Sequence, residues 1–212
     1  MKIWFLFLFL LLGLTTRAQT PSPSRSHRPT VADHTRAVAA FQQELNAEYR
    51  NPEASPLTPE DRATFTGLPF FPVNYAACVE ARFVPDSLSV PFAMQTSTSR
   101  RPMYRKYGEV YFTLSGQPLK LTVYQNQELM KKPGFEDYLF VPFTDLTNGH
   151  ASYGGGRYLD VRIGQIQGGT LVLDFNRAYN PFCAYSGRYS CPVPPVENRL
   201  PVAIQAGVKS PH

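Results

Sequence analysis

The chain has 212 residues and carries 21 lysines and arginines against 16 aspartates and glutamates, a formal net charge of +5 at pH 7. This excess is too small for the dense basic surface typical of nucleic-acid-binding proteins, so we expect no nucleic-acid partner. The length allows a sizeable core, and one domain is the simplest organisation. Aromatic residues make up 13% of the chain and prolines number 20, a composition that favours a β-rich fold over a helix bundle.

The first residues have the layout of a secretory signal peptide. Lys2 is followed by the apolar run Ile3–Leu14, and residues 16–18 approximate a small-x-small cleavage site. The apolar run is shorter than the roughly 18 residues of a membrane-spanning helix, and the cleavage site has no cysteine for lipid attachment. We therefore expect residues 1–18 to be removed, leaving an exported protein, periplasmic or secreted, without a membrane span.

Two helices are expected next. Residues 19–30 are rich in proline and hydroxyl side chains, which predicts a disordered leader. Apolar residues at three- and four-residue steps predict an amphipathic helix over Ala32–Tyr49. Thr58 and Pro59 are typical of a helix start, which predicts a short second helix ending near Phe65. We therefore divide residues 31–212, a single domain, into a helical segment over 31–66 and a β domain over 67–212.

The rest of the chain reads as eight short strands without βαβ alternation. This pattern predicts a mainly β fold, an antiparallel sandwich or barrel with the helical segment packed on it. Glycine-containing turns at 115–117 and 167–169 predict two hairpins. The expected strands are Tyr75–Phe83, Leu88–Met94, Glu109–Leu114, Leu119–Tyr124, Tyr138–Phe143, Tyr158–Ile163, Thr170–Phe175 and Leu200–Ala206.

Two cysteines near the end of the chain allow two interpretations. In an exported protein, Cys183 and Cys191 are expected to form a disulfide that closes a short loop. Alternatively, Cys183 is a nucleophile with His150 as its base, oriented by Asp145, Asp174 or Asn176. A zinc site would need more Cys and His ligands at characteristic spacings, so we expect no metal and no cofactor.

A glycine-rich loop precedes one of the strands. Residues 154–156 are three consecutive glycines, which permit close approach of a ligand or of another chain segment. Arg157 follows, with a guanidinium suited to a carboxylate or phosphate. In the alternative interpretation, Arg157 pairs with Asp145 or Asp174 and holds a loop.

Residues 174–207 are unusually rich in proline, tyrosine and polar groups. They form either a lid over the core or a rigid loop that carries ligand groups. The catalytic candidates are Asp145, His150, Asp174, Cys183 and Glu197, and the ligand-binding candidates are Arg157, Tyr158, Asn176, Tyr179 and Asn180.

Several motifs are shared with a known family: GLPFFP at 67–72, FTDLTNG at 143–149, YGGGRY at 153–158 and DFNRAYNP at 174–181, with the pairs CP at 191–192 and EN at 197–198. Together they resemble the bacterial and archaeal domain-of-unknown-function family 1684, in the exported form common in Bacteroidetes-type bacteria. The resemblance covers about Phe41–Val208 and implies no activity. Val208 stands where many members have glutamate. Members that appear cytosolic keep both cysteines, so the resemblance leaves room for a thiol pair, a metal or a reactive thiol.

Three functions follow from these observations. The first is a binding module for a small polar or anionic, or polyhydroxylated, ligand held between the triple-glycine loop and residues 174–197. The second is a hydrolase that uses carboxylates as acid and base, or Cys183 as nucleophile. The third is a structural envelope protein without a pocket. The sequence leaves open whether the protein is an enzyme.

Overall fold

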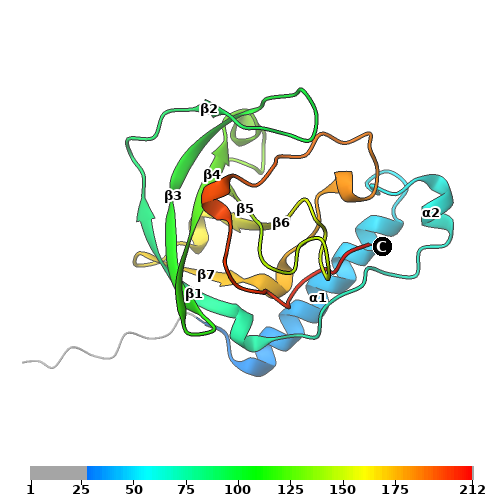
Figure 1. Cartoon of the computed structure of the whole chain (residues 1–212), viewed down its shortest axis with the longest axis horizontal. Helices are drawn as coiled ribbons and strands as arrows, with labels where there is room; N and C mark the ends of the chain where they lie inside the picture. Colours follow the sequence, from blue (N-terminus) through cyan, green and yellow to red (C-terminus); the bar gives the residue numbers. More distant parts are fainter. Residues whose placement is uncertain (1–27, 212) are drawn as a thin grey trace, which may run out of the picture.

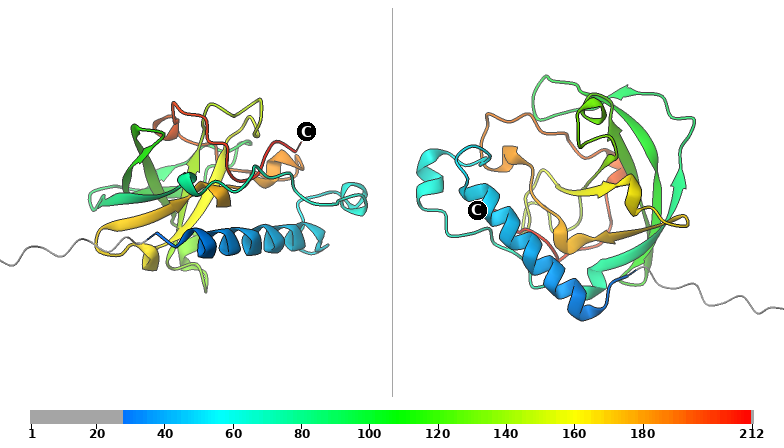
Figure 2. Two further views of the ribbon diagram at one scale, coloured as in Figure 1. Left: turned by 90° about the horizontal axis from the view of Figure 1, so that it is seen from below. Right: turned by 180° about the vertical axis from the view of Figure 1, so that it is seen from behind.

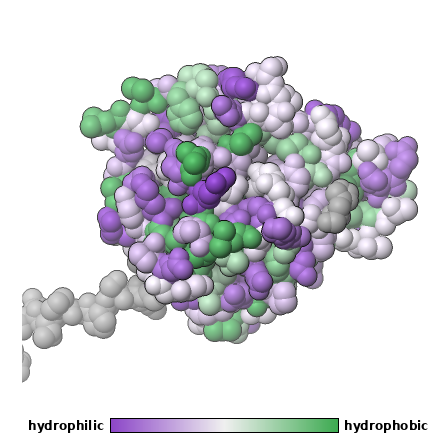
Figure 3. Space-filling model, in the orientation of Figure 1, coloured by the Kyte–Doolittle hydropathy of each residue, from purple (hydrophilic) through white to green (hydrophobic). Residues whose placement is uncertain are grey.

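The computed structural model describes residues 28–211, which form a curled antiparallel sheet with a helix packed across its open side (Figures 1 and 2). The expected signal peptide and residues 19–27 of the expected leader lie outside the described residues. No helix within residues 28–211 is long and apolar enough to cross a membrane. Hydrophilic residues are interspersed with small hydrophobic groups on the face shown in Figure 3.

Two α-helices precede the sheet, as the sequence predicts. Helix α1 (Val31–Arg50) begins at Thr30, whose side chain accepts a hydrogen bond from the backbone N–H of Asp33 at 3.2 Å. Its buried face includes Val38, Leu45 and Tyr49, members of the predicted apolar stripe. Helix α2 (Pro59–Ala63) has the predicted threonine cap and first-turn proline.

Seven strands form one sheet within the described residues. Their order is β6-β5-β4-β3-β1-β7, with β2 paired to β3, and the pairs are antiparallel. The strands are β1 (Cys78–Pro85), β2 (Phe92–Ala93), β3 (Met103–Leu114), β4 (Gln117–Asn126), β5 (Tyr138–Phe143), β6 (Arg157–Arg162) and β7 (Thr170–Asp174). Short 3-10 turns are η1 (Tyr75–Ala77), η2 (Leu129–Lys131), η3 (Ile163–Gln165), η4 (Phe175–Arg177), η5 (Phe182–Ala184) and η6 (Val196–Asn198).

The two end strands of the sheet are neighbours in sequence. Only residues 163–169 join β6 to β7, yet these strands stand at opposite ends of the strand order. The sheet therefore curls into a half-barrel that brings its ends toward each other (Figure 1). No ladder joins the two end strands within residues 28–211. The gap between them is called the seam below.

The hairpin predicted through residues 167–169 is wrong in its pairing. The chain does turn there, with an isolated bridge between Gln167 and Thr170. However, β7 pairs with β1, from Cys78 opposite Asp174 to Arg82 opposite Thr170. This register places Leu171 and Leu173 fully in the core. Burial of apolar side chains thus decides the partner of β7, whereas the turn residues alone favoured β6.

Two other predicted strands differ from the structure. Residues 200–206 form no strand, although their even-numbered side chains lie in the core of the half-barrel. Within the described residues, the backbone of the segment bonds to other backbone groups only just after β5, from Leu200 N–H to the oxygen of Thr144 at 2.8 Å and from Leu146 N–H to the oxygen of Val202 at 3.0 Å. Of the predicted strand Leu88–Met94, only β2 forms. Leu88 is 90% exposed, and its N–H bonds to the side chain of Asp86 in a local turn at 3.2 Å. The sheet therefore has seven strands where the sequence predicted eight.

The hairpin predicted at residues 115–117 is confirmed. Strands β3 and β4 pair from Leu114 opposite Gln117 onward, and the two loop residues, Ser115 and Gly116, have φ values of 52° and 76°. Two positive φ values match the twist of a tight antiparallel hairpin.

Substitution of Gly207 would show how closely residues 200–207 pack against the segment that contains Ala178. The φ of Gly207 is 80°, and a Cβ there would lie 2.5 Å from the backbone oxygen of Ala178. We expect Gly207→Ala to lower the free energy of unfolding by about 2–4 kcal/mol, because it adds a backbone clash to left-handed strain. Gly168→Ala is the matched control: its φ is also positive, but the space around it is open, so we expect a loss of about 1 kcal/mol or less. Urea unfolding of both variants would contradict this explanation if the two losses were equal.

Candidate functional site

The buried ion pair of Arg157 and Asp145 joins β6 to the last segment of the chain. Both side chains have no exposed area, and Arg157 Nη2 lies 2.8 Å from Asp145 Oδ2. The same guanidinium donates to the carbonyl oxygens of Ile204 at 2.8 Å and Ala206 at 2.5 Å. Its desolvation lowers the pKa of Arg157, while Asp145 opposes this effect. This geometry fits the interpretation in which Arg157 fixes a loop, and leaves it no face toward a ligand.

The triple-glycine loop also serves packing. A Cβ at Gly156, whose φ is 90°, would lie 2.7 Å from both the backbone oxygen of Phe143 and a ring carbon of Pro194. The close approach that the sequence indicated is therefore made by another segment of the chain.

Four further predicted residues share no hydrogen bond with one another within residues 28–211. His150 is exposed in a turn, whereas buried Asn180 donates to the backbone oxygen of Lys209 at 2.8 Å. Tyr158 donates to the backbone oxygen of Pro192. Glu197 lies 3.0 Å from both Tyr124 Oη and Lys106 Nζ. Burial would raise the pKa of Glu197, but hydrogen bonds from its own backbone, Lys106 and Tyr124 lower it overall.

Cys183 and Cys191 are adjacent free thiols in the structure, and no disulfide joins them within residues 28–211. The backbone N–H of Cys183 donates to Cys191 Sγ at 3.1 Å. The thiol of Cys191 stabilises the Cys183 thiolate through a hydrogen bond, which lowers the pKa of Cys183 to about 6 although burial opposes it. The same hydrogen bond and burial raise the pKa of Cys191. Ser97 and Tyr153 also hydrogen-bond to Cys183, and the exposed His150 is not among these partners.

The remaining predicted residues, Asp174, Asn176 and Tyr179, lie at the seam between β6 and β7. Two cavities adjoin there, of about 160 Å³ and 340 Å³, and both are lined by Asp160, Gln165 and Arg177. We call them together the seam groove. Helix α1 contributes His34 and Ala37 to the smaller cavity and Phe41 to the larger one. The wall of the seam groove thus combines residues of both end strands of the sheet with residues of the helix that covers them (Figure 2).

Asp160 is the central carboxylate of the seam groove. It projects from the outer face of β6, and its Oδ1 accepts hydrogen bonds from the hydroxyls of Tyr138 and Tyr179, each at 2.7 Å. The surrounding protein displaces water and raises the pKa of Asp160, while the two tyrosine hydrogen bonds oppose this shift. Burial and the charge of Asp160 raise the pKa values of the Tyr138 and Tyr179 hydroxyls well above the usual value of tyrosine. Both phenols are therefore donors at neutral pH, and Asp160 Oδ2 accepts no hydrogen bond from residues 28–211.

Arg177 is the available cation of the seam groove. It is exposed on η4, directly after β7, and its guanidinium lies 5.0 Å from the ring centroid of Phe41. Within the described residues it makes no ion pair or hydrogen bond. By contrast, the nearby Arg162 is paired with Asp137 at 2.7 Å. The guanidinium donors of Arg177 are therefore unpaired among the described residues.

The inner end of the seam groove joins three different side chains. His34 is buried at the first turn of α1, and its Nε2 lies 3.0 Å from Asp174 Oδ2. Cys78, the first residue of β1, lies beside both. Burial and then the charge of Asp174 raise the pKa of Cys78 to about 11, against the effect of Arg28.

Asn176 orders this inner end of the groove. Its Nδ2 donates to Asp174 Oδ1 at 2.8 Å, and it also exchanges two hydrogen bonds with the backbone of Asn74. The amide thus links η4 to the residue before η1 and fixes the carboxylate of Asp174.

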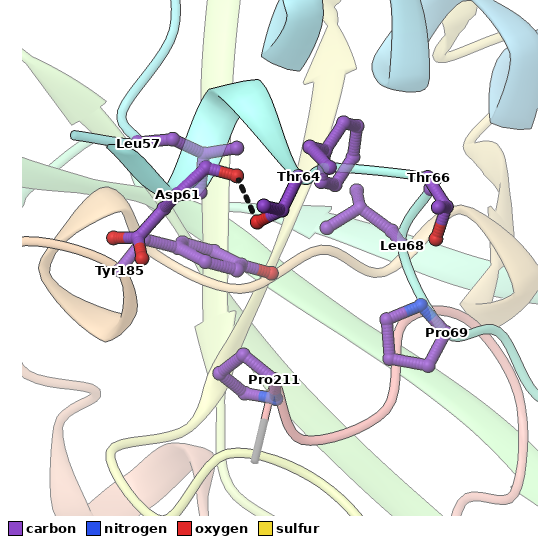
Figure 4. A pocket seen from close by; sticks show the side chains of 10 residues that line it. Leu57, Asp61, Thr64, Thr66, Leu68, Pro69, Tyr185 and Pro211 are labelled. Carbon is purple, nitrogen blue, oxygen red and sulfur yellow. Dashed lines mark hydrogen bonds between the residues drawn. The ribbon is translucent and has the colours of Figure 1, made fainter. Parts of the chain in front are cut away.

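A separate cavity of about 260 Å³ lies between α2 and the end of the chain (Figure 4). Its acidic residue, Asp61, already accepts a hydrogen bond from the hydroxyl of Thr58 at 2.9 Å, and its own backbone N–H donates to that hydroxyl at 3.1 Å. Thr64 donates to the backbone oxygen of Asp61 at 3.2 Å. No other ionisable carboxylate and no basic side chain lines it, so the seam groove is the better candidate site.

The comparisons with known proteins identify the family. The model of a family described as "Protein of unknown function (DUF1684)" matches residues 63–209. The chain belongs to the DUF1684 family. It is also similar to the solution NMR structure of an uncharacterised protein from gene locus rrnAC0354 of Haloarcula marismortui, with 33% identity and a TM-score of 0.66. That similarity covers 84% of this chain and 95% of the archaeal one. No match was found among curated proteins.

The DUF1684 match includes most of the seam groove but not the helix over it. Cys78, Asp160 and Asp174 fall inside residues 63–209, whereas His34 precedes the match. The sequence interpretation missed His34, Cys78, Asp160 and Arg177. His34 carried one usable signal: a histidine in an amphipathic helix, four residues before Val38 of its apolar stripe.

The two arginines of β6 provide a test of the buried pair. We expect Arg157→Met to lower the free energy of unfolding by about 3–5 kcal/mol, because it leaves Asp145 charged and buried. Arg162→Met, which removes the half-exposed pair with Asp137, should cost about 1 kcal/mol or less. Equal losses in urea unfolding would contradict the assigned role of Arg157.

The thiol pair predicts a pH-dependent reactivity. In the reduced protein, we expect Cys183 to react with iodoacetamide at a rate that rises to a plateau with a midpoint near its pKa of about 6. Cys191→Ala removes the hydrogen bond to the thiolate, so the midpoint should move upward and the rate at pH 7 should fall several-fold. Peptide mass spectrometry follows each cysteine separately. An unchanged midpoint would contradict the pairing.

Proposed function

We propose that the chain binds a small polyhydroxylated ligand that carries one anionic group in the seam groove. The observation that carries this proposal is the unpaired guanidinium of Arg177 on the same cavity wall as Asp160. A guanidinium recognises carboxylate or phosphate through directional, charge-assisted hydrogen bonds. The anionic group of the ligand is therefore assigned to Arg177.

The hydroxyl groups of the ligand are assigned to Asp160 and its surroundings. Asp160 Oδ2 is a free acceptor among the described residues, and the side-chain nitrogen of Gln165 adds a donor on the same wall. Phe41 and Phe135 supply apolar surface on which a ring can lie. The larger cavity, about 340 Å³, is within the size range of small-molecule sites. Of the ligand residues expected from the sequence, Tyr179 keeps that role, and Asn176 supports Asp174.

A hydrolase remains the alternative function. The observation that favours it is the raised pKa of Asp160, since a carboxyl group that keeps its proton nearer neutral pH is suited to general-acid catalysis. Asp174, beside His34, would then be the second acid–base group. This alternative requires that Asp160→Asn abolish turnover of a substrate while binding persists.

Two further proposals rest on the sequence pattern. We propose that residues 1–18 direct export, so that the mature chain is periplasmic or secreted. In such an oxidising compartment, Cys183 and Cys191 would form a disulfide. A thiol titration of the denatured, exported protein should then find one free thiol, that of Cys78. Three free thiols would contradict the disulfide.

The binding proposal is tested with glucose 6-phosphate and gluconate as anionic probes and glucose as the neutral one. We expect calorimetry to show tighter binding of an anionic probe, and Arg177→Gln to weaken it by about tenfold or more, because a charged hydrogen bond is lost. Arg82→Gln is the matched control, since Arg82 of β1 is likewise exposed and its guanidinium lies 4.6 Å from the ring centroid of Tyr111 on β3.

Three results would contradict this proposal: no binding of either anionic probe, equal loss in Arg177→Gln and Arg82→Gln, or chemical-shift changes away from the groove. If the protein is instead a structural envelope protein without a pocket, neither anionic probe should bind.

A further inference from the structure

The inner end of the seam groove brings together three types of metal-binding side chain. His34 comes from α1, Cys78 from the start of β1 and Asp174 from the end of β7. One ring nitrogen, the thiol sulfur and one carboxylate oxygen all lie within 4.8 Å of one another. These residues are 140 positions apart at the extremes, so the cluster is a product of the tertiary fold and not of a local motif.

The separations are close to those of a coordinated ion. Zinc bonds of about 2.0–2.3 Å in a tetrahedral arrangement place ligand atoms roughly 3.3–3.7 Å apart. The imidazole and carboxylate atoms are already 3.0 Å apart, and small side-chain rotations would bring the sulfur from within 4.8 Å to bonding range. All three residues line the smaller cavity of about 160 Å³.

The surroundings hold these side chains in place. The ring of His34 packs edge-on against Tyr75, with centroids 5.3 Å apart. Asp174 Oδ1 accepts from both the backbone and the side chain of Asn176, which directs Oδ2 toward His34. Such outer hydrogen bonds orient metal ligands.

One buried atom of the cluster has incomplete bonding. His34 is 1% exposed, and its Nδ1 has no hydrogen-bond partner within residues 28–211. This nitrogen points away from Nε2, the ring atom that lies 3.0 Å from Asp174 Oδ2. An ion bound through Nε2 leaves Nδ1 unpaired, so the metal site is argued from the proximity and types of the three side chains.

We propose that His34, Cys78 and Asp174 bind a Zn²⁺ ion whose fourth position faces the seam groove. Nitrogen, sulfur and carboxylate ligands together suit zinc better than magnesium or calcium, which take oxygen ligands. Three protein ligands with one open position are typical of sites where zinc binds water or a ligand atom. The site lies beside Asp160 and Arg177, on the wall of the same cavity.

The test uses cobalt, because a thiolate ligand gives Co²⁺ a charge-transfer band in the near ultraviolet. The experiment uses a variant with Cys183→Ser and Cys191→Ser, in which Cys78 is the only remaining cysteine. We expect one Co²⁺ per chain with this band, displaced by one Zn²⁺. Cys78→Ser should abolish the band, and His34→Gln or Asp174→Asn should weaken metal binding by about tenfold or more.

Two further variants separate coordination from general damage. His150→Gln removes an exposed histidine away from the cluster and should leave affinity unchanged. Asn176→Ala should weaken binding about tenfold through misorientation of Asp174. Circular dichroism of the metal-free variants verifies folding, and if His34→Gln does not fold, the near-isosteric Cys78→Ser still decides. Absence of Co²⁺ binding, a missing band, or a band that survives Cys78→Ser would overturn the proposal.

Metal binding is measured without any organic ligand, so its result is separate from the proposed function. If Co²⁺ does not bind while gluconate still depends on Arg177, the metal proposal fails and the binding function stands. If Co²⁺ binds but neither anionic probe does, the metal proposal stands and the proposed binding function fails.

Discussion

The buried contact of Arg157 with Asp145 is the interaction on which the rest of the fold depends. Residues 200–206 place alternate side chains in the core of the half-barrel but belong to no strand. Their carbonyl oxygens at 204 and 206 are instead satisfied by the guanidinium of Arg157, and the N–H of Ile204 by Asp145 Oδ1 at 3.1 Å. A planar group with five donors can serve several carbonyls at once. At residues 204 and 206, the ion pair thus supplies the hydrogen bonds that a neighbouring strand would otherwise supply.

This arrangement also explains why a groove exists at the seam. The half-barrel is filled from within by the side chains of residues 200–206, so its core is complete without closure between β6 and β7. The two end strands are left with a gap, which α1 covers through His34, Ala37 and Phe41. Asn176 fixes η4 against the segment before η1. Polar groups from three separate elements therefore converge where the sheet remains open.

Local patterns predicted the elements well where local interactions dominate. The spacing of Val38, Leu45 and Tyr49 reproduces the buried face of α1, and the turn at Ser115 and Gly116 reproduces the β3–β4 hairpin. The same reasoning failed at residues 167–169, because the turn is compatible with several partners and the core chose β1 for β7. It also failed at residues 200–206. There the alternation of buried and exposed side chains is real, but among the described residues the backbone bonds only to residues 144 and 146 at its start, and the side chains of Arg157 and Asp145 serve residues 204 and 206.

The sequence by itself determined the mainly β class, the amphipathic first helix, the short segments that become strands and the family of the chain. It also indicated that the segment after Asp174 carries polar groups of interest, since composition and turn chemistry are local properties. Only the tertiary structure decided which groups meet. It enclosed Arg157 with Asp145, and it placed His34 of α1 beside Cys78 and Asp174, which start and end different strands. The physical reason is that curling of the sheet and packing of the helix set these distances, and neither leaves a periodic trace in the sequence.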